Sequence, residues 1–146
     1  MAAVIRDATR DDYGTIVRLI RQLAEDAGEE ACPTEEDVER YLSFPGSGAL
    51  LAEKEGGVVG LLTYNIRPGL YHAGDCCVID ELVVDRAARG RGIGSALLGH
   101  LLLEQERTGC AEVAVSCLRD NERAIRLYRR HGLVDDALLL ERHFRE

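Results

Sequence analysis

The sequence predicts an α/β fold in which about four helices flank a mixed central β-sheet of about six to seven strands. Segments whose apolar residues alternate, as in strands, are interrupted by segments with the three-to-four-residue spacing of helices. The order of these segments is β-αα-βββ-α-β-α-β. It predicts an antiparallel N-terminal part followed by at least one right-handed β-α-β crossover.

The N-terminal third supplies one short strand and two helices. Residues 3–7 are the strand candidate, and Thr9 stands three residues before Asp12, as in a capping box. The following helix has an apolar face and ends near Gly28. That face consists of Ile16, Leu19, Ile20 and Leu23. A second helix opens with the cap signal PTEED at 33–37 and runs to about residue 44.

The middle third reads as three strands. Residues 49–55 and 58–66 are expected to form a hairpin around the turn Gly56-Gly57. A loop over 67–75 leads to a nearly continuous apolar strand, 76–84. Because a strand that is apolar on both faces is covered on both, we expect this strand to be central.

The C-terminal third continues with helix, strand, helix and strand. A leucine stripe predicts a helix over 92–108, and 111–117 is expected to be a buried strand. Asp120 or Asn121 caps the next helix, which Gly132 closes. Residues 136–142 are predicted to form a last strand.

Length and composition limit which classes of function are possible. A chain of 146 residues fits one domain spanning 1–146. A net charge of −8 argues against nucleic-acid binding and suits cationic small molecules or basic peptide tails. No signal peptide or membrane-spanning stretch is visible. The five cysteines show no Cys-x-x-Cys spacing, so we expect no metal site, buried free thiols and a cytoplasmic location.

The most informative stretch is a glycine-rich turn, DRAARGRGIGS, at 85–95. Its glycines leave the amides of the first helical turn accessible, and the helix dipole and two arginines add positive potential. Such a turn suits a pyrophosphate. It lacks the lysine of a P-loop, and G-x-G-x-x-G fails in both registers. The alternative is an ordinary strand-to-helix loop with charged decoration.

The turn carries the pattern Arg89-x-x-Gly92-x-Gly94, which resembles the acetyl-CoA signature of the GNAT superfamily of N-acetyltransferases. The strand end LVVD at 82–85 and the motif Asn121-x-x-Ala124-x-x-Leu127-Tyr128-x-x-x-Gly132 are also similar to that family. The order of elements resembles the GNAT fold, so the likeness covers nearly the whole chain. Its strength lies between about 76 and 133.

The resemblance implies how acetyl-CoA is held. The strand 76–84 would diverge from 111–117, with the pantetheine arm in the gap, paired with the backbone of Leu82, Val83 and Val84. The pyrophosphate would lie on the turn. The residues expected there are Arg89, Gly90, Arg91, Gly92, Ile93, Gly94 and Ser95. Asn121 would hydrogen-bond the arm; the alternative is a simple N-cap.

Tyr128 and two carboxylates are the candidate catalytic residues. Tyr128 would donate a proton to the leaving thiolate, although it also fits simple core packing. Asp80 and Glu81, two acids in a buried strand, are candidates to accept the proton of the amine. A regular strand would aim only one of them at the cleft, but GNAT strands often bulge here. Glu81 is favoured over Asp80, for which a structural ion pair with an arginine is an equal alternative.

The remaining candidates have plainer interpretations. The acidic residues of 25–30 are read as a solvated face, and His131 as a packing or surface residue. The aromatic residues Tyr41, Phe44, Tyr64 and Tyr71 are candidate pocket walls. The ending after Asp136 is short, which leaves the acceptor side open or completed by a second subunit, so a homodimer is expected.

Together these observations predict an enzyme that transfers the acetyl group of acetyl-CoA directly to a primary amine in a ternary complex. The expected acceptor is a small amine. A protein or peptide amine, and a non-catalytic acetyl-CoA sensor, are the alternatives within this family. A protein that binds another nucleotide is the alternative outside it.

Overall fold

The computed structural model describes residues 2–145 and places five strands of that range in one mixed sheet, in the order β1-β2-β3-β4-β5. These are β1 (Val4–Asp7), β2 (Ser47–Lys54), β3 (Gly57–Gly69), β4 (Gly74–Val84) and β5 (Glu112–Val115). The pairs β1–β2, β2–β3 and β3–β4 are antiparallel, and β4–β5 is parallel. The expected α/β class, mixed sheet and antiparallel first part are confirmed.

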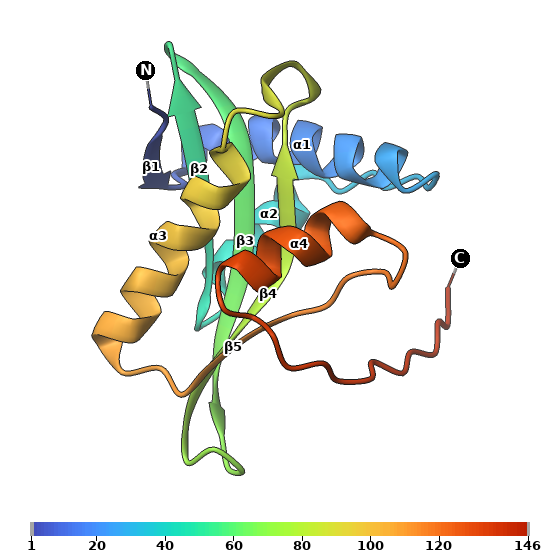
Figure 1. Ribbon diagram of the computed structural model, residues 1–146. Coiled ribbons are helices and arrows are strands. Elements are labelled where there is room, and N and C mark those ends of the chain that lie inside the picture. Colours follow the sequence, from blue (N-terminus) through green and yellow to red (C-terminus); the bar gives the residue numbers. More distant parts are fainter. Residues whose placement is uncertain (1, 146) are drawn as a thin grey trace.

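Four α-helices cover the two faces of the sheet, as predicted. They are α1 (Tyr13–Asp26), α2 (Glu35–Ser43), α3 (Ile93–Thr108) and α4 (Glu122–Arg130). Helices α1 and α2 enclose one apolar core with β2, β3 and β4, built around Leu19, Leu51 and Leu61. Helices α3 and α4 enclose a second core on the other face, built around Leu62 and Leu97 (Figure 1). None of the helices in the described range is long and apolar enough to cross a membrane.

The capping predictions at two helices are confirmed. Thr34 caps α2 by accepting from the Asp37 backbone, and the Asp37 carboxylate accepts from the Thr34 backbone in return. Asn121 caps α4 by accepting from the Ala124 backbone at 3.2 Å. Gly132 follows that helix with a φ of 91°, a backbone conformation that glycine adopts without strain.

The strand count is lower than predicted. Residues 136–142 form no strand: this segment runs as exposed extended chain past α4 (Figure 1), with Leu140 82% exposed. A strand exists only where a neighbour accepts its backbone hydrogen bonds, and no strand of the described chain lies beside this segment. Apolar spacing alone therefore overestimated the sheet.

Four further expectations need correction. The strand expected at 76–84 is β4, the fourth of five, and the central strand of the sheet is β3. The strand expected to be buried within 111–117 is β5, a half-exposed strand at the edge of the sheet. The predicted loop 67–75 is mostly strand, because β3 and β4 stay paired out to Gly69 and Gly74. Of the five free cysteines, Cys76 and Cys77 are buried, but Cys32 and Cys117 are exposed.

Candidate active site

A β-bulge in β4 is the central feature of the site. Thr63 of β3 pairs with Glu81, but the next residue, Tyr64, pairs with Ile79, so Asp80 is an extra residue. A regular strand sends neighbouring side chains to opposite faces. The bulge instead leaves Asp80 and Glu81 both on the face covered by α1 and α2, as their partners show. Tyr41 of α2 donates to Asp80 Oδ2 at 2.7 Å, and the Thr63 hydroxyl donates to the Glu81 carboxylate.

The two carboxylates differ in environment. Asp80 is exposed, whereas Glu81 is half-buried. Burial raises the pKa of Glu81, the hydrogen bond from Thr63 partly opposes this, and the charge of Asp80 raises the pKa further. A carboxylate whose pKa is raised toward neutrality is better suited to accept a proton than an ordinary surface acid.

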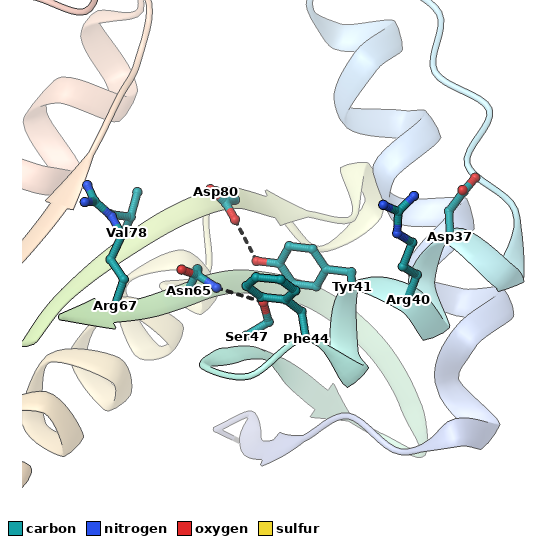
Figure 2. Close-up of a pocket in the computed structure, with 9 residues that line it drawn as sticks. All are labelled: Asp37, Arg40, Tyr41, Phe44, Ser47, Asn65, Arg67, Val78 and Asp80. Atoms are coloured by element: carbon teal, nitrogen blue, oxygen red, sulfur yellow. Dashed lines mark hydrogen bonds between the residues drawn. The ribbon is translucent and has the colours of Figure 1, made fainter.

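An open cavity of about 590 Å³ lies beside Asp80, between α2 and strands β3 and β4 (Figure 2). It is lined by Asp37, Arg40, Tyr41, Phe44, Ser47, Asn65, Arg67, Val78 and Asp80. The predicted wall residues Tyr41 and Phe44 are present. Tyr71 is not, because it is 95% exposed at the tip of the β3–β4 hairpin. Sequence reasoning missed Asn65 and Arg67, because both lie in a segment expected to end a strand or form a loop.

The strands β4 and β5 separate next to this cavity. They pair only from Cys76 to Ile79 with Glu112 to Val115, so no β5 residue faces β4 beyond the bulge. The backbone of Leu82 to Val84 therefore borders a gap in the sheet. One of its groups is already engaged, because the Arg89 guanidinium donates to the Val84 carbonyl at 2.9 Å.

Tyr128 of α4 belongs to the opposite face of the sheet from the carboxylates. It packs in the core with Leu98 and Ile79 and is only 9% exposed. Burial, with a smaller effect of nearby Cys117, raises its pKa to about 12. The phenol is therefore protonated at neutral pH. Tyr128 does pack in the core, whereas its role as a proton donor stays a prediction.

The glycine-rich turn has the expected open backbone. Gly90 and Gly92 have φ values of 80° and 79°, which few other residues adopt. The first helical bond of α3 runs from the Ala96 amide to the Gly92 carbonyl, which leaves the amides of residues 93–95 without helical acceptors. The Ser95 hydroxyl lies 2.7 Å from His131 Nε2 and so links the start of α3 to the end of α4.

The arginines of the turn differ in whether they are paired with an acidic residue. Arg89 is paired with Asp26 at the end of α1, and Arg86 also binds Asp26, at 3.0 Å. Glu25 and Asp26 are exposed, as expected of a solvated acidic face, and both are also paired with Arg86. Arg91 is exposed. Within residues 2–145, no cluster of three or more His, Cys, Asp or Glu residues is placed to hold a metal ion.

Comparison with known proteins agrees with this geometry. The model of the Acetyltransferase (GNAT) family matches residues 15–133. The chain is 30% identical to thialysine N-epsilon-acetyltransferase of Bos taurus, over 90% of this chain and 84% of that protein.

Two solved structures share the fold. One, a transcriptional regulator from Bacillus halodurans, has a TM-score of 0.86 at 23% identity, over 97% of this chain and 99% of its own. The other, an aminoglycoside acetyltransferase from an uncultured soil metagenomic sample, has a TM-score of 0.82 at 20% identity, over 99% and 96%.

Replacing Thr63 with valine tests the environment of Glu81. The variant keeps the shape of the side chain but removes a hydrogen bond that favours the charged carboxylate, so we expect the pKa of Glu81 to rise further. NMR titration of the carboxyl carbons measures it, with Thr108→Val at the exposed end of α3 as the matched control. An unchanged or lower pKa of Glu81 would contradict this account.

Proposed function

The chain belongs to the GNAT acetyltransferase family, and from this premise we propose that it transfers the acetyl group of acetyl-CoA directly to a small primary amine. GNAT acetyltransferases use acetyl-CoA as the acetyl donor. One observation carries the proposal. The bulge presents Asp80 and Glu81 on one face of the sheet, and Tyr128 lies on the other, where β4 and β5 have separated.

The donor fits the open parts of the structure. The pantetheine arm would lie in the gap along Leu82, Val83 and Val84, and the pyrophosphate would take the amides from Arg89 to Ser95. Arg91 is exposed and able to add its charge there, whereas the charge of Arg89 is balanced by Asp26. The Asn121 side chain accepts from α4 through its oxygen, which leaves its amide hydrogens to donate to the arm.

Two protons must leave the amine. A primary ammonium, with a pKa near 10.4, first gives one proton to Glu81, which passes it to solvent. The amine nitrogen then attacks the thioester carbonyl, so that a C–N bond forms and the C–S bond breaks. Tyr128 donates a hydrogen bond to the departing sulfur, and the thiolate takes up the second proton of the nitrogen, which reaches it through solvent.

Hydrogen bonding by Tyr128 matters more than its acidity. Its pKa of about 12 lies above that of a thiol, near 8.5, so complete proton transfer before the C–S bond breaks would be unfavourable. A buried hydroxyl that points to the departing sulfur instead stabilises the charge as it develops. Described residues supply no competing hydrogen bond to this hydroxyl that shifts its pKa.

The relatives support an amine as acceptor. One is named for thialysine and another for aminoglycosides, both of them amine-bearing compounds. The cavity is open enough for a small amine, and the carboxylate of Asp80 lines it. A protein or peptide amine is the alternative acceptor.

The first test is thiol release from acetyl-CoA with a panel of small amines, aminoglycosides and peptides, alongside acetyl-CoA binding. We expect turnover with small amines. Turnover with peptides alone would show that the acceptor is a peptide amine and not a small amine. Tight acetyl-CoA binding without any turnover would instead identify a sensor, and no acetyl-CoA binding would overturn the proposal.

Replacing Tyr128 with phenylalanine keeps the core filled but removes the hydroxyl. We expect kcat to fall about 10- to 100-fold, with little change in the Kd of acetyl-CoA. Tyr71→Phe, at the exposed hairpin tip, is the matched control. An unchanged kcat would remove Tyr128 from the mechanism.

Replacing Glu81 and Asp80, one at a time, with the corresponding amide tests which of the two accepts the proton of the amine. Glu81→Gln should lower kcat/KM by about 100-fold or more and abolish the acidic limb of its pH profile. The sign follows from the raised pKa of Glu81, because its base form is lost as the pH falls through that value. Asp80→Asn should keep the limb. The reverse pattern would assign the base to Asp80.

A further inference from the structure

We infer that the acceptor amine also carries an anionic group, and that Arg67 binds this group at the end of the cavity away from α2. The inference rests on the proposed acetyl transfer and narrows its substrate class. Arg67 lies two positions after Asn65 on β3, so both side chains lie on the same face of the strand, and both line the cavity.

The cavity contains two arginines, and only one has a charged neighbour. Arg40 lies close to Asp37 on the same helix, and its charge contributes to lowering the pKa of that carboxyl. Arg67 lies on the other side of Tyr41 and Asp80 (Figure 2). Its backbone belongs to the β3–β4 ladder, but among residues 2–145 its side chain has no hydrogen bond or ion pair with another protein group. Its positive charge is therefore available to a ligand.

The distance between the charges suits a short amine. Asp80 bulges opposite the step from Thr63 to Tyr64, and Arg67 lies three residues beyond Tyr64 on β3. Three strand residues span about 10 Å. An arginine side chain that leans along the strand shortens this span, so a linear chain of four or five carbons can join an ammonium at the carboxylates to an anion at Arg67.

Charge also discriminates between amine classes. The net charge of −8 attracts any cation to the protein, but it does not decide what fits this cavity. A second ammonium placed near Arg67 without an anion beside it would meet a like charge, which disfavours binding. A carboxylate in the same place would receive two parallel N–H donors from the planar guanidinium. The cavity thus favours an amine with an anionic end over a diamine.

The test compares lysine with lysine amide and cadaverine as acetyl acceptors. We expect kcat/KM for lysine to exceed that for each of the other two by about 10-fold or more.

Arg67→Gln should raise KM for lysine about 10- to 100-fold, with kcat nearly unchanged and little effect on lysine amide. Arg67→Lys should restore part of the loss. Arg107→Gln, at the exposed end of α3, is the matched control. Aminobutylphosphonate, compared with butylamine, shows whether a phosphonate serves as the anion.

The outcomes separate this inference from the proposed function. Equal transfer to lysine, lysine amide and cadaverine would overturn the inference and leave acetyl transfer intact. If no amine is acetylated, NMR titration of the protein with lysine decides the matter. Binding that requires both the carboxylate of lysine and Arg67 supports the inference even though the transferase proposal has failed. Absence of such binding overturns both.

Discussion

The single extra residue at Asp80 determines how the rest of the site is arranged. Without it, strand alternation would send Glu81 to the face of α3 and α4, away from the cavity. With it, Val83 packs in the core under α1 and α2, while Leu82 and Val84 pack against the core of the opposite face. The bulge therefore brings both carboxylates to the face of α1 and α2 without disturbing either core. It lies immediately beyond the last residue of β4 that pairs with β5.

Helix α2 is fixed to the same bulge. The Tyr41 hydroxyl donates to Asp80 and lies 3.0 Å from the Tyr64 carbonyl oxygen, on the strand that faces the extra residue. Burial and the charge of Asp80 raise the pKa of Tyr41, which keeps this phenol protonated as a donor. The wall of the cavity and its carboxylates are thus parts of one hydrogen-bonded unit. Asp80 is thus held by Tyr41, whereas Glu81 has the raised pKa that the proposed role as base requires.

Much of the fold could be predicted because its signals are local. Apolar spacing located the four helices, and the Gly56-Gly57 turn located the β2–β3 hairpin. The features that were predicted incorrectly depend on contacts between residues that are far apart in the sequence. Pairing of Gly69 with Gly74 extends two strands through a segment whose Pro68 and Gly69 suggest a loop. Residues 136–142 have strand-like apolar content, but local content cannot provide a partner strand. The bulge was expected only from family resemblance, because register is set by both strands together.

The glycine-rich turn shows why arginines beside a phosphate-binding motif need not all bind phosphate. Arg86 and Arg89 pair with α1, and Arg18 of α1 pairs with Asp85 at 2.9 Å. Exposed ion pairs of this kind add little to stability, typically 0 to about 1 kcal/mol each. Their main effect is on position: they hold the turn against α1 and leave Arg91 exposed. Helix α1 also supports the core beneath the carboxylates. One helix therefore sets the position of the glycine-rich turn relative to the face of the sheet that carries Asp80 and Glu81.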